Sequence, residues 1–499
     1  MKKQAWVLPL LLVYAYPALA GTLAERIEEL FAASPAARGA FWGVEAVDLA
    51  TGKTLYELNP GRFFVPASNT KLFTTAMALT RLGPDFTFQT RVLSASAPDA
   101  AGRISGDLLL VGGGDPNLSA RPIPYQKGPI TGNPLTAIED LADQIAAKGI
   151  TRVDGDIAGD DTWYVWEPYA PGWGIDDPLY DYGAPVSALT LHDNTLTLHI
   201  APGAQAGDLA ALTLRPPMEY YHIDNRIQTV AAGAARRVHY HRAAGSLDLE
   251  MWGALPLRDR GEDLLLGIED PAQFAAMALR QALEDRGIAA GGVAVAHHRF
   301  PNEVPDLTQG PELEPLSGTE LARRISAPLL EDLRITDKVS QNLHAELALR
   351  AVGRARRNVG SREAGLAELK DFLAEAGVTA DQYNINDGSG LSRQNLVTPA
   401  TVVKLLRFMY QSSARESWIS LLPVGGQDGT LGSRFADSAL AGRIHAKTGS
   451  VAHVSALSGY LQRTKGDWVA FSVLVNNFNG PAGEIRNVMD RICAVIMEE

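Results

Sequence analysis

The chain has 499 residues, of which 46% are hydrophobic and 20% are charged, a composition typical of globular proteins with more than one core. It excludes a disordered chain, a collagen and a coiled coil. The formal net charge of -12 gives no electrostatic attraction to nucleic acid or to anionic lipid. The single cysteine, Cys493, can form neither an intrachain disulfide nor a cysteine-rich metal site, and we expect it to be buried in a C-terminal helix. No cofactor and no metal are expected.

The first twenty residues differ in character from the rest of the chain. Lys2 and Lys3 precede an apolar run over residues 5–15, and small residues end the segment at Ala20. This pattern predicts a secretory signal peptide, residues 1–20, cleaved after Ala20. The apolar run is shorter than the ~20 residues that a membrane-spanning helix needs, so we predict an exported protein without a transmembrane anchor. The oligomeric state is left open, with a homodimer as one option.

The elements predicted before residue 84 are two helices and a hairpin. A short amphipathic helix follows Gly21, and residues 41–47 and 54–56 form a β-hairpin around a Thr51-Gly52 turn. The next helix, over 68–82, is apolar almost all round, which predicts a central, buried position.

Between residues 84 and 325 the chain changes to short β-rich runs separated by Gly, Pro and Asp. The predicted strands are 86–93, 107–111, 195–200 and 247–252, and the predicted helices are 135–147 and 273–286. We interpret 84–325 as an inserted region of one or two domains. The Pro- and Glu-rich stretch 301–320 is the predicted linker.

Longer helices return beyond residue 325. They are predicted at 343–352 and 362–376, followed by strands at 456–461 and 468–475 and a final helix from about Glu484. The hairpins near the two ends of the chain can complete one sheet. The sequence therefore predicts an α/β (α+β) domain made of residues 21–83 plus 326–499, with the β-rich insertion between its two parts.

The first of three short motifs, Ser68-Asn69-Thr70-Lys71, begins the predicted buried helix. Three residues make one helical turn, so Lys71 lies within reach of Ser68 Oγ. A serine hydroxyl is a poor nucleophile until a base takes its proton, and a desolvated lysine loses proton affinity and can be that base. Such a match occurs about once or twice by chance in a chain of this length. A lysine on a helix without a polar face, however, is costly unless it has a task or a partner.

The second motif is Ser340-Gln341-Asn342, in a polar break before the helix predicted from residue 343. Residues i and i+2 of an extended turn project to the same side, so Ser340 and Asn342 can both face a cleft. The alternative is a helix N-cap, a position at which serine is preferred.

The third motif is Lys447-Thr448-Gly449-Ser450, within a strand predicted over 443–453. Glycine in a strand often marks the close approach of a ligand or of another backbone. A lysine and hydroxyl groups beside it can hold a carboxylate. The alternative is a surface turn at Thr448-Gly449.

Together and in this order, the three motifs are the set shared by serine β-lactamases and penicillin-binding proteins. The chain resembles the class C low-molecular-mass penicillin-binding proteins, the D-alanyl-D-alanine carboxypeptidase/endopeptidase family, over nearly all of its length after residue 20. The further stretches that resemble this family are 112–119, 170–173, 387–392 and 429–431. A large insertion between the first two motifs is also what this family implies, because a compact β-lactamase has only a small helical subdomain there.

The resemblance implies a serine β-lactamase/penicillin-binding-protein transpeptidase-like domain and gives roles to the matching residues. Ser68 is the implied nucleophile and Lys71 the base that takes its proton. Ser340 relays the proton toward the leaving amine, and Asn342 orients Lys71 and the substrate amide. The sequence departs from the family at Gln341, where Asp is common, and we expect this side chain to point away from the cleft.

The third motif is the implied substrate-binding strand. Lys447, Thr448 and Ser450 bind the terminal carboxylate of the substrate beside Gly449. The backbone N–H groups of Ser68 and Ser450 form the implied oxyanion hole, with donors directed to the point where negative charge develops.

The implied activity is that of a serine-type D-Ala-D-Ala carboxypeptidase, and also of a D-alanyl-meso-diaminopimelyl endopeptidase, in the periplasm. Its partners are peptidoglycan stem peptides and cross-links, with β-lactams as covalent inhibitors. Two alternatives remain. A β-lactamase would need a device for rapid deacylation, and no glutamate stands in a matching context. A non-catalytic penicillin-binding scaffold on the same fold would be expected to have lost some of the catalytic side chains.

Two further groups of residues are ambiguous in the sequence. Trp163, Trp166 and Trp173, together with Asp160-Asp161, suit either a substrate groove or a core. His445 shares a strand face with Lys447, and we expect it to be solvated and without a catalytic role.

Overall fold

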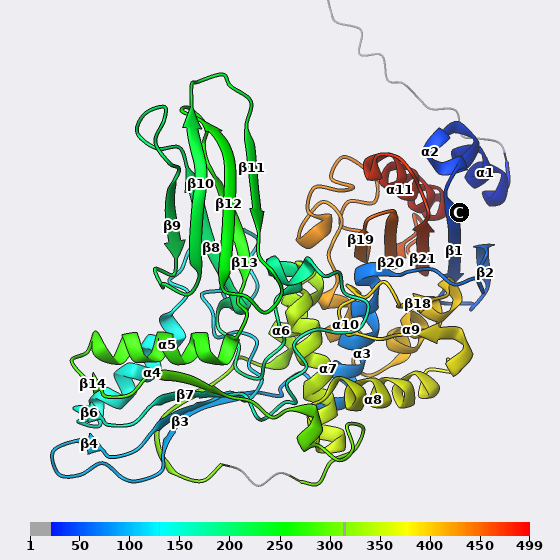
Figure 1. Cartoon of the computed structure of the whole chain (residues 1–499). Coiled ribbons are helices and arrows are strands. Elements are labelled where there is room, and N and C mark those ends of the chain that lie inside the picture. Colours follow the sequence, from blue (N-terminus) through cyan, green and yellow to red (C-terminus); the bar gives the residue numbers. More distant parts are fainter. Residues whose placement is uncertain (1–20, 129, 313–315) are drawn as a thin grey trace, which may run out of the picture.

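One sheet joins the two ends of the described chain. The computed structural model describes residues 21–128, 130–312 and 316–499, so the predicted signal peptide, residues 1–20, lies outside them. The sheet is antiparallel, in the order β19-β20-β21-β1-β2 (Figure 1). Its strands are β1 (Phe41–Asp48), β2 (Thr54–Leu58), β19 (Ile444–Val451), β20 (Val454–Gln462) and β21 (Trp468–Asn476). Because β1 pairs with β21 along its whole length, the prediction that the two hairpins complete one sheet is confirmed.

Helices cover both faces of this sheet. On one face α1 (Leu23–Ala33), α2 (Pro35–Arg38) and α11 (Ala482–Glu498) bury an apolar core that includes Cys493, in the helix where it was expected. The other face carries α3 (Lys71–Leu82) and α9 (Pro399–Gln411). Against α3 pack α6 (Leu329–Lys338), α7 (Asn342–Arg357) and α8 (Arg362–Glu375), while α10 (Arg415–Leu421) packs against α6 and α9.

The helix α3 is central, as its apolar pattern predicts. All of its residues from Lys71 to Leu79 are buried. It is shorter than the predicted helix, because residues Ala67–Thr70 form a 3-10 turn instead of α-helix. Ala67 has a φ of +47°, a conformation that cannot continue a right-handed helix backwards. The first motif therefore stands at a sharp entry to the helix.

The insertion builds its own sheets around one apolar core. That core joins buried side chains from Val92 to Ala322. We therefore propose that the insertion is divided from the rest of the chain at residues 84 and 325. A five-stranded sheet has the order β15-β7-β5-β3-β16, and the three-stranded sheets are β14-β6-β4, β13-β8-β9 and β10-β12-β11. In Figure 1 strands β8 to β13 rise away from the five-stranded sheet and from α4 and α5.

The bounds of the insertion elements are β3 (Gln89–Ser94), β4 (Arg103–Ile104), β5 (Leu108–Val111), α4 (Thr136–Ala147), β6 (Arg152–Val153), β7 (Ile157–Asp160), β8 (Thr195–Ala201), β9 (Ala211–Arg215), β10 (His222–Val230), β11 (Arg237–His241), β12 (Asp248–Pro256), β13 (Glu262–Gly267), α5 (Pro271–Glu284), β14 (Ala289–Ala290), β15 (Ala294–His297) and β16 (Thr319–Ile325). After α8 a small two-stranded sheet joins β17 (Tyr383–Asn384) to β18 (Leu396–Val397). No helix among the described residues is long and apolar enough to cross a membrane.

One predicted strand of the insertion needs correction. The strand predicted over 86–93 begins only at Gln89, and before it the rings of Phe86 and Phe88 pack edge to face, 5.2 Å apart. The linker predicted over 301–320 stays a prediction, and most of its described residues are exposed. Val304 joins Val165 in a small buried cluster, and residues 319–320 already belong to β16.

A buried hydroxyl in the main sheet gives a test of this packing. Tyr460 on β20 accepts a hydrogen bond from Trp418 Nε1 at 2.8 Å and donates one to the Leu406 carbonyl at 2.7 Å. Replacing it with phenylalanine leaves the Trp418 indole N–H buried without its acceptor and removes the bond to the Leu406 carbonyl, so we expect Tyr460→Phe to lower the free energy of unfolding by about 2 kcal/mol. Denaturant unfolding measures this loss. An unchanged free energy of unfolding would contradict it.

Candidate active site

The nucleophile candidate, Ser68, is held in the 3-10 turn between two other segments. The side-chain amide of Asn69 donates to the Lys447 carbonyl at 2.9 Å, which ties the turn to β19. On the other side the turn meets the loop over residues 387–392. A Cβ on Gly390 would stand 1.9 Å from the Ala67 carbonyl oxygen, so only glycine permits this approach.

Lys71 lies directly beside Ser68. Its Nζ is 3.0 Å from Ser68 Oγ, 2.6 Å from Asn342 Oδ1 and 2.7 Å from the Ser389 carbonyl oxygen. A neutral amine has two N–H donors and one lone pair, and these neighbours match it. The two carbonyl oxygens accept from the donors, while the lone pair is left for the Ser68 hydroxyl proton.

The surroundings of Lys71 also favour loss of its proton. The side chain is fully buried. Burial, and then the nearby charge of Lys447, lower the pKa of Lys71 to about 7, against the opposing carboxylates of Asp387 and Glu346. A lysine with this pKa is present as free base near neutral pH and can act as a general base.

The second motif occupies the sharp turn between α6 and α7. Ser340 has a φ of +64°, and Asn342 is the first residue of α7. Asn342 Oδ1 contacts Lys71 Nζ of the first motif, and Ser340 Oγ contacts Lys447 Nζ of the third. The N-cap of α7 is Gln341, whose Oε1 accepts from the Leu343 N–H at 3.0 Å. The alternative that Ser340 caps the helix is therefore wrong.

Lys447 lies behind Ser340 and is fully buried. Its Nζ donates to Ser340 Oγ at 2.8 Å and to the Thr448 carbonyl at 2.9 Å. Burial lowers its pKa, while the nearby carboxylate of Asp337 opposes that shift. Asp337 is itself buried and accepts from Thr75 Oγ1 at 3.0 Å. The sequence reasoning missed Asp337, because nothing in the pattern around α6 distinguishes it from a solvated acid.

Gly449 brings β19 against the nucleophile candidate, Ser68. A Cβ at this position would stand 2.7 Å from the Pro66 carbonyl oxygen and 3.1 Å from the Ser68 nitrogen. The close approach that the glycine predicted is therefore by the backbone of the first motif. It places the backbone of Ser450, the next residue, beside that of Ser68, as an oxyanion hole requires.

Two hollows meet at Ser450. One, of about 290 Å³, is lined by Ser68, Asn342 and Ser450 together with Asp177, Tyr182 and Arg393. The other, of about 330 Å³, extends past Thr448 to Thr430 and Arg486. The structure thus brings together all the predicted site residues, which are Ser68, Lys71, Ser340, Asn342, Lys447, Thr448, Gly449 and Ser450.

The loop over residues 387–392 supports Lys71 from below. Asp387 is buried and accepts from the Gly390 N–H at 2.9 Å and the Ser392 N–H at 2.7 Å. Trp173 of the insertion donates its indole N–H to Asp387 at 3.0 Å. The 387–392 stretch was noted only through the family resemblance, and it fixes the Ser389 carbonyl that contacts Lys71.

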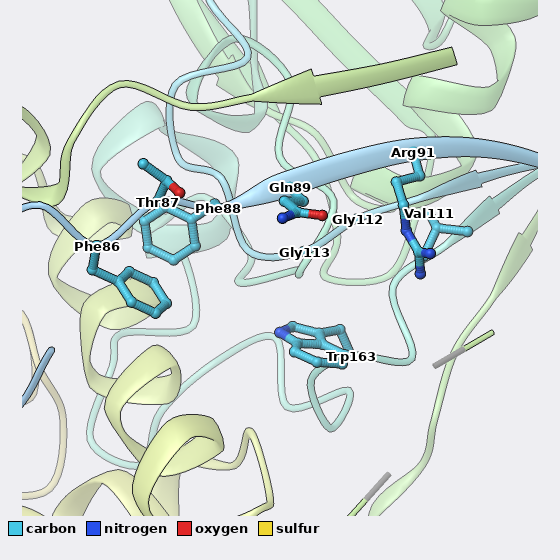
Figure 2. Close-up of a pocket in the computed structure, with 9 residues that line it drawn as sticks. All are labelled: Phe86, Thr87, Phe88, Gln89, Arg91, Val111, Gly112, Gly113 and Trp163. Carbon is cyan, nitrogen blue, oxygen red and sulfur yellow. The ribbon is translucent and has the colours of Figure 1, made fainter. Parts of the chain in front are cut away.

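Of the three ambiguous tryptophans, Trp163 and Trp166 line neither of the two hollows at Ser450. Trp166 stacks on His298 with 4.1 Å between ring centroids. Trp163 lines a separate apolar cavity of about 380 Å³ with Phe86 and Phe88 (Figure 2). The Arg354 guanidinium lies 4.1 Å from the centroid of the Trp163 ring.

His445 corrects an expectation, because it is half-buried against Trp468 instead of solvated. Burial and the charge of Lys338 lower its pKa. It lines a hollow with Lys338 and Arg415, apart from the one that holds Ser68.

Comparison with known proteins bears directly on this arrangement. Residues 23–496 match the model of the D-Ala-D-Ala carboxypeptidase 3 (S13) family. The chain belongs to this family. It is 37% identical to a D-alanyl-D-alanine carboxypeptidase of Actinomadura sp. (strain R39), over 95% of this chain and 86% of that protein.

The chain is also similar in fold to solved crystal structures. The crystal structure of penicillin binding protein 4 from Haemophilus influenzae superposes with a TM-score of 0.81 at 22% identity, covering 95% of this chain and 99% of that chain. The same protein complexed with a β-lactam superposes with a TM-score of 0.75 at 21% identity, over 95% of this chain and 100% of that chain. The predicted fold class and family resemblance are confirmed.

The low pKa of Lys71 predicts how acylation depends on pH. Below pH 7 the amine is protonated and its lone pair is occupied, so the second-order rate constant for acylation by benzylpenicillin should fall about tenfold per pH unit. Above pH 7 it should level off. Rates measured by intact mass between pH 5 and 9 test this expectation. A rate that still rises steeply between pH 8 and 9, as the ordinary lysine pKa would give, would contradict it.

Proposed function

We propose that the protein is a serine-type D-Ala-D-Ala carboxypeptidase that also cleaves D-alanyl-meso-diaminopimelyl cross-links of peptidoglycan. One observation carries the proposal, namely that Lys71 Nζ lies 3.0 Å from Ser68 Oγ with its two donors already bound by Asn342 and Ser389. This arrangement suits the removal of a proton from Ser68. Residues 1–20 support export, and we assign the enzyme to the periplasm.

The first chemical step is acylation. Lys71 takes the proton of Ser68, and Ser68 Oγ bonds to the carbonyl carbon between the two D-alanines. Negative charge moves to the carbonyl oxygen, where the N–H groups of Ser68 and Ser450 stabilise it. The C–N bond then breaks. The proton on Lys71 passes to Ser340 Oγ as the Ser340 proton passes to the departing amine, so D-alanine leaves with a neutral amine and its carboxylate.

The second step is hydrolysis of the acyl-enzyme. Lys71 takes a proton from water, the hydroxide oxygen bonds to the acyl carbon, and the proton returns to Ser68 Oγ as the ester bond breaks. In this cycle Lys447 is a positioning residue. Lys447 Nζ donates to Ser340 Oγ at 2.8 Å. Because Ser340 Oγ accepts this bond, its own proton points away from Lys447 and can be transferred to the leaving amine. A β-lactam follows the first step, but its leaving group stays attached and blocks water.

The cleft also supports a choice between substrates. Asp177 and Arg393 line the hollow beside Ser68, and their opposite charges complement the ammonium and carboxylate of a diaminopimelyl side chain. Thr448 borders the second hollow, and its Oγ1 donates to Thr430 Oγ1 at 2.8 Å. We assign the terminal carboxylate of the substrate to Thr448 and Ser450.

Intact mass over time after adding benzylpenicillin tests the nucleophile. We expect a stable adduct of one penicillin on the protein that lacks residues 1–20, and none on Ser68→Ala. D-alanine release from a stem pentapeptide should fall by on the order of 10³-fold or more in that variant. Rapid loss of the adduct with hydrolysed drug would indicate a β-lactamase instead. No adduct on the wild-type protein would indicate a non-catalytic scaffold.

A second measurement tests the carboxylate site. Thr448→Val removes a hydroxyl that donates to a charged group, so kcat/KM for a peptide ending in a free carboxylate should fall about 10- to 100-fold. The same peptide with an amidated C-terminus is the control, since it lacks the charge and should be affected little by the substitution. Equal losses on both peptides would exclude Thr448 as the carboxylate contact.

A further inference from the structure

The insertion holds the second motif from behind. Gln341 Nε2 donates to Asp193 Oδ2 at 3.0 Å, and Asn342 Nδ2 donates to the Tyr182 carbonyl oxygen at 2.8 Å. Both acceptors lie between β7 and β8, far in sequence from the motif. Gln341 and Asn342, which follow Ser340, are therefore held in place by the insertion as well as by α7.

Asp193 is a buried carboxylate held between two cations. It forms an ion pair with Arg121 and lies 3.1 Å from His344 Nε2. His344 is fully buried on α7, and its Nδ1 lies 2.7 Å from Asp332 Oδ1 on α6. Burial opposes ionisation of both groups, but Asp332 and Asp193 raise the pKa of His344 to about 9, and Arg121 and His344 hold the pKa of Asp193 well below its usual range.

The backbone that presents Asp193 is strained. The three consecutive residues 192–194 have φ values of 49°, 56° and 52°, and none is glycine. A run of left-handed residues persists only where its surroundings hold it in place. Here the Asn194 side chain accepts from the Leu191 N–H at 3.1 Å and donates to the Pro185 carbonyl at 2.9 Å. The strained turn thus faces a second strained residue, Ser340, across the Asp193 to Gln341 hydrogen bond.

We propose that Asp193 is a positioning residue of the insertion that fixes the Ser340 turn through Gln341, while the Tyr182 carbonyl orients Asn342 toward Lys71. The inference rests on the proposed function of the same site. It also accounts for the glutamine. Its N–H group meets the Asp193 carboxylate while its Oε1 caps α7, whereas a carboxylate at position 341 would face a second carboxylate.

A charge exchange tests the contact. Gln341→Glu keeps an oxygen for the Leu343 N–H but turns the donor toward Asp193 into an acceptor. Asp193→Asn supplies a donor in return, so the double variant can restore a bond with one carboxylate in the pair, as in the wild type. Gln205→Glu, at an exposed position of the insertion, adds the same charge away from the motif and is the matched control.

The readouts are the second-order rate constant for acylation by benzylpenicillin, kcat and KM for D-alanine release, and the midpoint of thermal unfolding. We expect Gln341→Glu to slow acylation by on the order of 10- to 100-fold, with the loss in kcat rather than in KM. The double variant should recover to within about threefold of wild type. Gln205→Glu should acylate at the wild-type rate.

The positioning role would be overturned if Gln341→Glu folds and acylates at the wild-type rate. A lower midpoint of thermal unfolding in that variant would then indicate a structural role only. A double variant slower than either single variant would overturn the positioning role as well. If Asp193→Asn does not fold, the rate for folded Gln341→Glu decides alone. Failure of the proposed function is distinguishable, because the wild-type protein itself would then form no Ser68 adduct.

Discussion

The buried amine of Lys71 is the constraint on which the rest of the site depends. Its Nζ contacts two carbonyl oxygens and the hydroxyl of Ser68, all of them uncharged. Desolvation makes the charged form costly, so the side chain is driven toward the neutral base. Burial of Lys71 costs folding free energy. The same burial lowers the pKa of Lys71 into the range that activation of a serine requires.

Meeting that constraint takes segments from distant parts of the chain. The first motif begins α3, the second lies after α6, the Ser389 carbonyl comes from a loop held by Trp173 of the insertion, and the third motif is the edge strand β19. Because β1 pairs with β21, the two ends of the chain close the sheet that carries β19. Folding must bring these parts together before any one of them is stabilised, so the site exists only in the complete domain.

The sequence was sufficient to predict those motifs and elements whose pattern lies within a short stretch of the chain. Motif spacing, strand alternation and the all-round apolar helix depend on neighbours in sequence, and the fold and family they predict are confirmed. Long-range partners were not predictable. Nothing around Asp193 or Gln341 indicates that they share a hydrogen bond, and His445 looks like a solvated strand residue until Trp468 from β21 is placed beside it.

Among the described residues, five of the ten non-glycine residues with positive φ lie around the proposed catalytic groups. Ala67 precedes the nucleophile with a φ of +47°, Ser340 has a φ of +64°, and residues 192–194 lie behind Gln341 with three positive values. Each such residue costs about 1–2 kcal/mol, and that cost must be offset by packing elsewhere. The apolar core of the insertion, which joins side chains from Val92 to Ala322, anchors the 192–194 turn. A part of the chain that contributes none of the three motifs therefore stabilises the geometry that they require, and the reacting groups need little rearrangement when substrate binds.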